Sequence, residues 1–298
     1  MSHKGKDMFL SNRGRAARGG TYSGFALKEV LAILVVMAML FAMLWPAISQ
    51  QRTPSRKTGC INNQHNVGIA LIRFEGEKNR YPGSTNNQNP DSEGLGGRET
   101  GWVYPLLPYL DRSDIFNTYS AGVSAGQVPD LRLKVLICEV PEGAENARSS
   151  YVVNTGWLGD AAPEDRALGV FTQQYRRSAD EARTLMNTGS IRDGLATTLM
   201  LAENVDAGNW TSPREGCVGF TWQPTAEPSP GFALNEGKGA GECLYPRPSS
   251  PHTGGFLATF CDGHTDFIDE DIDYAVYQQL MTPNGASFPQ QQPTSESY

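Results

Sequence analysis

One segment of the sequence has the spacing of a catalytic serine motif. Residues 122–126 read GVSAG, which matches the G-x-S-x-G pattern, and His252 or His264 would be available as the base. That motif requires a strand before the serine and a helix after it, whereas QVPD follows here and its proline disfavours a helix. We therefore predict a plain loop around Ser124 and a protein that is not an enzyme.

A group of acidic residues near the C-terminus has the chemistry of a calcium site. Its members are Asp262, Asp266, Asp269, Glu270, Asp271 and Asp273. Carboxylate oxygens are the ligands that Ca²⁺ prefers, but the order of an EF-hand loop is absent. A hairpin turn and a helix N-cap would account for most of these residues. We therefore expect no cofactor, and calcium is the alternative for this group.

The cysteine pattern does not indicate a zinc site. The five cysteines are Cys60, Cys138, Cys217, Cys243 and Cys261. They form no CxxC pair, and no histidine lies at metal-ligand spacing from them. If the domain is exported, one or two disulfides and one remaining thiol are expected, and spacing alone does not assign the pairs.

Charge is distributed unevenly along the chain. Residues 1–24 hold five basic residues and one acidic residue, so the remainder carries a net charge of -11, against -7 for the whole chain. Nucleic-acid binding needs clustered Lys and Arg, so the acidic remainder argues against a nucleic-acid partner. The basic N-terminal segment is typical of a cytoplasmic flank.

A long apolar run follows that basic segment. Residues 30–48 contain no charged side chain. A helix over residues 25–48 would be about 36 Å long, enough for a hydrocarbon core of about 30 Å. More basic residues precede the run than follow it, which predicts a cytoplasmic N-terminus. An ordinary signal peptide cut after Ala47-Ile48-Ser49 is the alternative, although its apolar core would usually have about 7 to 15 residues.

Lys28 and Glu29 lie at the head of this run, where charged groups are costly. In one interpretation both lie at the membrane interface, with the lysine reaching toward water. In the other, Glu29 meets an amine supplied by another copy of the chain, which offsets the cost of burying a carboxylate.

The remaining elements follow from local patterns. Apolar spacing predicts a helix that begins near Cys60 and ends before Tyr81-Pro82-Gly83, and a kink or interruption is expected within residues 49–59, which contain Pro54 and Gly59. Residues 84–100 are polar and predict a surface loop, and residues 101–117 predict a short helix or turn against the core.

The C-terminal half contains predicted strands and one closing helix. Strands are expected within residues 131–140, 149–157 and 189–204. FLATFCDGHTDFI predicts a hairpin with a two-residue turn at Asp262-Gly263, and a short helix follows within residues 269–281.

The N-terminal residues resemble a known processing signal. A basic leader, Gly24-Phe25, Glu29 four residues later and an apolar helix containing Pro46 resemble the class III signal of type IV pilins and type II secretion pseudopilins. The resemblance implies that a prepilin peptidase cuts between Gly24 and Phe25 and methylates the new N-terminus. It also implies that Glu29 neutralises the Phe25 amine of a neighbouring subunit during assembly. Lys28 stands where that group usually has an apolar residue.

The rest of the chain resembles a second pattern. His252, nine further residues and then Asp262-Gly263 are similar to the hallmark of the bacterial prepilin-type processing-associated His-X9-Asp-Gly family, a group of unknown function. Segments such as CINNQHNVGIAL, SYVVNTGW and FCDGHTDFIDEDID extend the resemblance over about residues 24–283. Cys60 and Cys138 occupy the two recurrent cysteine positions of that family, which makes them the first candidate disulfide.

We therefore predict an α+β, pilin-like fold, in which a long N-terminal transmembrane helix packs on an antiparallel β-sheet domain with long loops. The predicted parts are a basic leader (1–24), a transmembrane helix with the processing signal (25–48), a linker with the second half of the long helix (49–83), an extracytoplasmic α+β domain (84–282) and a disordered tail (283–298).

The expected role is that of a structural, pseudopilin-like protein. It would be a single-pass protein of the bacterial inner membrane, with a cytoplasmic N-terminus and a periplasmic or extracellular body. The expected partners are a prepilin peptidase, the membrane, and other pilin-like subunits or copies of the same chain, in a type II secretion or type IV pilus-like assembly. The alternatives are a membrane-tethered module that binds a glycan or calcium, and a secreted protein with an ordinary signal peptide.

Overall fold

The structure is a computed structural model of the 298-residue chain. It describes residues 27–50, 52–88, 98–121, 131–138, 148–157, 169–176, 184–236, 239, 241 and 243–285. The chain divides into two units, Met1–Arg52 and Thr53–Tyr298, called here the N-terminal unit and the body. Gly24, Phe25, the loop at Ser124 and most of the predicted tail lie outside the described residues.

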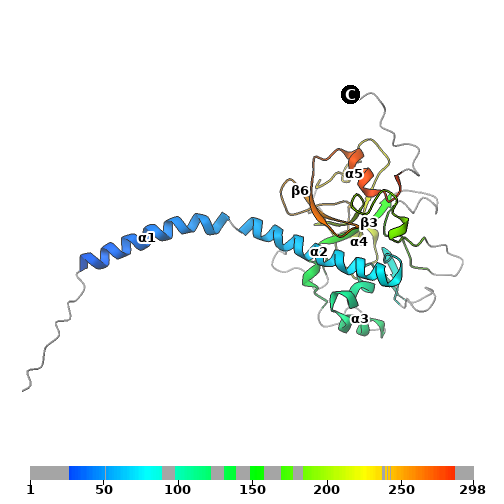
Figure 1. The fold of residues 1–298 in the computed structure, drawn as a ribbon, viewed down its shortest axis with the longest axis horizontal. Helices are drawn as coiled ribbons and strands as arrows, with labels where there is room; N and C mark the ends of the chain where they lie inside the picture. Colours follow the sequence, from blue (N-terminus) through cyan, green and yellow to red (C-terminus); the bar gives the residue numbers. More distant parts are fainter. Residues whose placement is uncertain are drawn as a thin grey trace, which may run out of the picture. The chain divides into compact units, whose positions relative to one another are not determined.

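The described part of the N-terminal unit is a single helix, α1 (Leu27–Gln50), drawn in blue in Figure 1. Its described large apolar side chains, from Leu27 to Phe41, are exposed, from 42% for Val30 to 81% for Leu27. Exposed apolar residues include five consecutive positions, 33–37, so they surround the helix axis. Judged by length and hydropathy together, the described residues contain no helix that could cross a membrane. The transmembrane helix predicted from the sequence is therefore not confirmed.

The body begins with α2 (Arg52–Lys78). Pro54 lies in the first turn of α2, where backbone N–H groups have no acceptor within the helix, so the N–H that proline lacks costs no hydrogen bond. Gly59 lies within the helix. Because α1 ends at Gln50 and α2 begins at Arg52, the chain forms two helices here, and the division lies within the predicted segment 49–59 but before Pro54 and Gly59. Its predicted apolar face is buried, with Val67 and Leu71 among the fully covered side chains.

Five strands form the central sheet in the order β5-β3-β4-β6-β7. Their bounds are β3 (Tyr151–Trp157), β4 (Leu199–Glu203), β5 (Gly219–Trp222), β6 (Gly255–Phe260) and β7 (Thr265–Asp269). All neighbours are antiparallel except β3 and β5, which are parallel. The α+β class is confirmed, but the sheet is mixed and not wholly antiparallel. The strand β5 was not predicted, and β3 and β4 lie where strands were expected.

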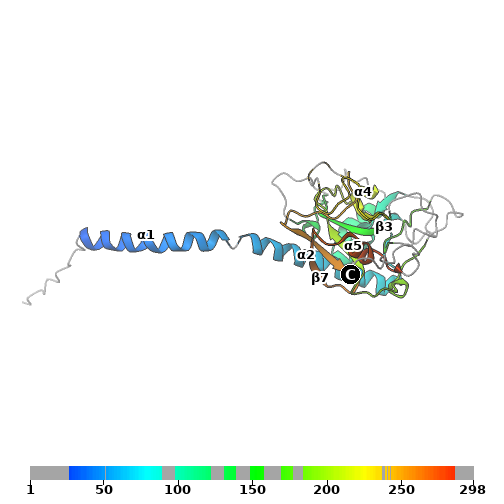
Figure 2. The same ribbon diagram turned by 90° about the horizontal axis from the view of Figure 1, so that it is seen from above.

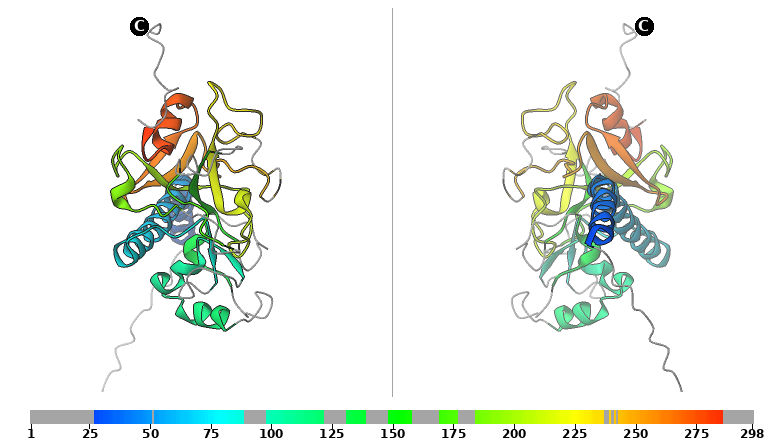
Figure 3. Two further views of the ribbon diagram at one scale, coloured as in Figure 1. Left: turned by 90° about the vertical axis from the view of Figure 1, so that its right-hand side faces the viewer. Right: turned by 90° about the vertical axis from the view of Figure 1, so that its left-hand side faces the viewer.

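Helices cover both faces of this sheet. One hydrophobic cluster joins α2 to β4 through side chains such as Leu71 and Leu201, and the other joins α5 (Tyr274–Met281) to β6 through side chains such as Met281 and Phe256. Figure 3 shows the two helices on either side of the strands. The helix α2 approaches the sheet closely, because a Cβ atom at Gly68 would lie only 2.9 Å from the Thr259 methyl carbon.

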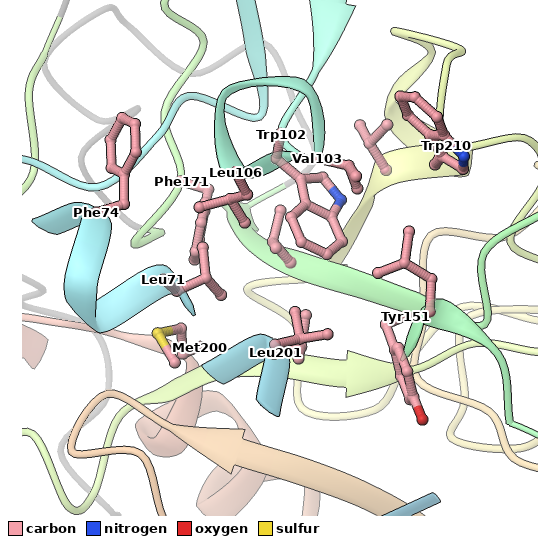
Figure 4. Packing of buried hydrophobic residues seen from close by; sticks show 14 of the residues in the cluster. Leu71, Phe74, Trp102, Val103, Leu106, Tyr151, Phe171, Met200, Leu201 and Trp210 are labelled. Carbon is pink, nitrogen blue, oxygen red and sulfur yellow. The ribbon is translucent and has the colours of Figure 1, made fainter. Parts of the chain in front are cut away.

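Short elements complete the body, and Figure 2 labels one of them, α4, in a view from above. They are β1 (Thr85–Asn87), β2 (Glu99–Gly101), η1 (Tyr104–Leu110), α3 (Ser113–Ser120), η3 (Lys134–Leu136), η5 (Thr188–Ser190) and α4 (Glu215–Val218). Figure 4 shows Trp102, Leu106 and Phe171 gathered against Leu71 of α2, so the short helix predicted within residues 101–117 does pack against the core.

Two predicted segments differ from the structure. Residues 84–88 and 98–100 were expected on the surface, but β1 and β2 pair with each other and Asn86 and Asn87 are buried. The Asn86 side chain exchanges hydrogen bonds with the Gly83 backbone, which compensates for its burial. Residues 131–138 were expected to be a strand but contain η3, since their apolar side chains fill the core without a sheet neighbour.

The β6–β7 hairpin is confirmed, but its turn is longer than predicted. The Phe260 amide donates to the His264 carbonyl, so Cys261, Asp262 and Gly263 form a three-residue connection. Gly263 has φ of 93°, the left-handed conformation that a three-residue hairpin needs at its last position. The predicted closing helix is also confirmed as α5, whose N-cap Asp273 accepts a hydrogen bond from the Ala275 amide.

Candidate functional site

Four side chains from distant parts of the sequence meet inside the body. Cys60 lies on α2, Cys138 follows η3, Glu203 ends β4, and His252 lies three residues before β6. All four are buried, and their potential metal-ligating atoms lie within 4.8 Å of one another. We call this group the buried cluster. Cys60 and Cys138 are joined in a disulfide, the pair that the sequence resemblance implied.

Glu203 is held in place by hydrogen bonds to one of its carboxylate oxygens. Its Oε2 accepts from the Ser250 hydroxyl at 2.6 Å and from the Leu257 amide at 3.0 Å. The regular pairing of β4 with β6 ends at Ala202–Ala258. The amide of Leu257, the β6 residue next to this pair, donates its hydrogen bond to the Glu203 carboxylate. Glu203 is 1% exposed. A carboxylate at such depth is costly unless hydrogen bonds or a cation compensate it.

His252 supplies the group that faces both the carboxylate and the disulfide. Its Nε2 lies 3.6 Å from Glu203 Oε1 and 3.4 Å from Cys138 Sγ. Its backbone amide donates to the Ser250 hydroxyl, so Ser250 contacts both His252 and Glu203. With the disulfide formed, the cluster combines an acid–imidazole pair with two sulfur atoms that carry no charge.

The strand β3 closes one side of the buried cluster. Tyr151 is paired with Glu203 across the sheet, and its hydroxyl donates to the Cys60 carbonyl at 3.2 Å. In Figure 4 this hydroxyl points away from the other labelled core side chains. Burial, followed by the nearby Glu203 carboxylate, raises the pKa of Tyr151 well above its ordinary value. Tyr151 is therefore a neutral hydrogen-bond donor in this cluster.

Residues 49–275 of the chain match the family described as Protein of unknown function (DUF1559). The chain belongs to this family. The matched range includes every residue of the buried cluster and most of the body, whereas most of α1 precedes it. No curated protein and no solved structure matches the chain.

The other residues of the proposed family motif lie apart from His252. Asp262 and Gly263 follow β6, whereas His252 precedes it, and six strand residues span about 20 Å. Asp262 instead binds its own hairpin: its Oδ1 accepts from the His264 amide at 3.0 Å and contacts the His264 ring at 2.6 Å. Partial burial raises the pKa of Asp262, but the hydrogen bonds from His264 outweigh it and lower that pKa overall.

The acidic residues considered for calcium are used in turns and caps. Asp269 accepts a hydrogen bond from the Asp271 amide, Asp273 caps α5, and Glu270 accepts one from the Asn235 side chain. Within the described ranges, the single convergent group of His, Cys, Asp and Glu ligands is the buried cluster. The structure therefore brings together Cys60, Cys138 and His252 from the sequence-based candidates, and adds Glu203.

Glu203 was not predicted from the sequence to be part of a site. The sequence does contain one indication of its role: Glu203 ends the otherwise apolar run LMLAE, and an ionisable side chain on a buried strand needs a partner. The remaining cysteines are also accounted for: Cys217 and Cys243 form a second disulfide, and Cys261 is a buried free cysteine. Burial raises the pKa of the Cys261 thiol above its ordinary value, which disfavours the nucleophilic thiolate form.

Proposed function

We propose that the protein is a pseudopilin-like structural subunit whose N-terminal helix assembles with helices of other subunits after processing. The observation that carries this proposal is the apolar surface of α1, whose large side chains are exposed around the whole helix from Leu27 to Phe41. A helix that is apolar on all sides needs a lipid or protein environment to cover it. Neighbouring helices and the bacterial inner membrane would supply that cover.

The residues before and at the start of α1 support the same role. Gly24-Phe25 and Glu29 have the order of a class III processing signal. In the proposed mature protein, a prepilin peptidase has removed residues 1–24 and methylated the new N-terminus. Glu29 lies in the first turn of α1. A carboxylate there would pair with the Phe25 amine of a neighbouring subunit, which reduces the cost of placing both charges in an apolar assembly.

We further propose that His252, Asp262 and Gly263 form the hallmark of the His-X9-Asp-Gly group within the DUF1559 family. Each end of this motif stabilises a different part of the fold. His252 contacts Glu203 in the buried cluster, and Asp262-Gly263 form the β6–β7 turn. In this proposal the motif maintains the architecture of an extracytoplasmic body and does not catalyse a reaction. The proposed topology is single-pass, with the N-terminus in the cytoplasm.

Association between subunits tests the proposed role of α1. Copies of the full chain with one additional cysteine introduced near the start of α1 are crosslinked in membranes of a bacterium that has a prepilin peptidase. We expect Glu29→Gln to abolish the crosslinked dimer while leaving processing intact, because the carboxylate that pairs with the neighbouring amine is gone. The matched control is Lys28→Gln, which removes the adjacent charge and should preserve crosslinking. Equal crosslinking by the parent and Glu29→Gln would refute the assembly role.

A further inference from the structure

The buried cluster contains the complete donor set of a zinc site, with its two sulfur ligands joined to each other. We infer that reduction of the Cys60–Cys138 disulfide converts the cluster into a site for Zn²⁺, held by the two cysteines, His252 and Glu203. This inference concerns the body alone and does not depend on processing or assembly at the N-terminus.

The spacing of the donor atoms fits tetrahedral coordination. Bonds of about 2.3 Å to sulfur and about 2.0 Å to nitrogen or oxygen place neighbouring ligand atoms roughly 3.3 to 3.8 Å apart around zinc. The His252 Nε2 atom lies 3.4 Å from Cys138 Sγ and 3.6 Å from Glu203 Oε1. All four donors lie within 4.8 Å of one another, and the two sulfur atoms, which are bonded to each other in the disulfide, must separate on reduction before they can surround one ion with His252 and Glu203.

The fold fixes these ligands in the way that metal sites require. Cys60 is on a helix and Glu203 on a central strand, so both backbones are held by regular structure. Outer hydrogen bonds orient the ligands: Ser250 and the Leu257 amide both donate to Glu203 Oε2, while Oε1 faces His252. Around a metal ion, such outer contacts typically contribute 10- to 100-fold in affinity.

The chemistry of the conversion is a two-electron reduction. A small dithiol donates two electrons and two protons to the Cys60–Cys138 bond and becomes a disulfide itself, and the two cysteines become thiols. When Zn²⁺ binds, each thiol releases one proton and its thiolate bonds to the metal. Neutral His252 donates a nitrogen lone pair and Glu203 a carboxylate oxygen. Oxidation by a disulfide reverses the sequence and expels the ion.

A purely structural disulfide would not need the other two ligands. The second disulfide, Cys217–Cys243, shows this contrast, because no described histidine or carboxylate joins it in a metal-ligating group. Both disulfides lie in the same body and both would be reduced by the same reagent. The second disulfide therefore serves as an internal control for zinc that binds to any reduced pair of cysteines.

The test is metal uptake by the full chain, purified in mild detergent without oxygen, in oxidised and dithiol-reduced forms. After incubation with Zn²⁺ and removal of free metal, we expect about one ion per reduced chain and none in the oxidised chain. Replacing Zn²⁺ by Co²⁺ should give the intense visible absorption of a tetrahedral site and a near-ultraviolet thiolate band. Absence of bound metal in the reduced chain, or equal binding in the oxidised chain, would overturn the inference.

Variants assign the ligands. Cys217→Ser with Cys243→Ser should still bind one ion with the same cobalt spectrum, whereas Cys60→Ser with Cys138→Ser should bind none. Glu203→Gln should weaken zinc binding at least 10-fold and change the spectrum, since an amide oxygen is a poorer ligand than a carboxylate. Circular dichroism checks folding of each variant, and the spectrum of the parent chain decides the question if Glu203→Gln does not fold. Binding that is lost in the Cys217/Cys243 variant would contradict the assignment.

Discussion

The two disulfides should differ in how much they stabilise the body, and the difference follows from their separations in the sequence. Cys60 and Cys138 are 78 residues apart, whereas Cys217 and Cys243 are 26 residues apart. In the chain-entropy description, a crosslink stabilises the fold by restricting the unfolded chain, and the effect grows with loop length. For these loops it amounts to about 4.5 and about 3.5 kcal/mol at 25 °C. Removing the longer crosslink should therefore cost about 1 kcal/mol more.

Urea unfolding of two matched double variants of the full chain in mild detergent tests this expectation. Cys60→Ser with Cys138→Ser and Cys217→Ser with Cys243→Ser remove the same number of sulfur atoms from buried or half-buried positions. With a slope near 3 kcal/mol per molar urea, the midpoint should fall by about 1.5 M for the first variant and about 1.2 M for the second. Contacts of Cys138 with His252 add to the first loss. A larger loss in the Cys217/Cys243 variant would refute the reasoning.

Three further predictions concern packing, hydrogen bonding and pH. Gly68→Ala should destabilise the body by about 1–3 kcal/mol, because the new Cβ would lie 2.9 Å from the Thr259 methyl carbon. Gly76→Ala on the same helix has open space around the new Cβ and should stabilise the body by up to about 1 kcal/mol. The urea midpoints of the two variants measure this difference. Gln64→Leu should cost about 2 kcal/mol or more in the same assay, because the Gln64 amide donates to two strand carbonyls across β4 and β6, and an unchanged midpoint would contradict this. Asp262→Asn should destabilise the hairpin at neutral pH but not in acid, because the pKa of Asp262 is lower in the folded state than in the unfolded state. The stabilisation from the Asp262 carboxylate is therefore present above the unfolded pKa of about 4 and is lost as the pH falls through the folded pKa. A stability difference from the parent that persists at pH 2 would exclude this explanation.

Much of the fold could be predicted because the decisive signals are local. Asp262-Gly263 between two alternating runs specified the β6–β7 hairpin, and Asp273 before an apolar run specified α5. The length of the turn was less predictable, because Gly263 can serve a two-residue or a three-residue connection and the register of both strands decides between them.

Other elements depend on contacts that sequence patterns do not contain. The strand β5 has four buried residues and no alternation, and it was missed because only its neighbour β3 identifies it as a strand. Asn86 and Asn87 were predicted on the surface since their side chains are polar, but hydrogen bonds within the body compensate for their burial. In both cases tertiary structure determined the outcome.

The buried cluster illustrates the same limit for a functional site. Cys60 and His252 are separated by most of the body, and only the packing of α2 against the sheet brings them together. A zinc site was not predicted because the ligands lack the short sequence spacing of small zinc modules. That spacing is not required when the ligands come from a helix, a strand and two loops. The resemblance supplied Cys60, Cys138 and His252, but Glu203 could be placed only by the structure.

Processing as a prepilin would leave a defined mature N-terminus, which mass spectrometry can identify. The full chain is expressed with a prepilin peptidase, recovered from membranes and analysed by mass spectrometry, with Gly24→Ala as the matched control that should remain uncut. If a prepilin peptidase processes the chain, the mature protein begins with N-methylated Phe25. A chain that begins at Gln50 would indicate an ordinary signal peptide, and an intact Met1 would indicate no processing; either result would refute processing as a prepilin.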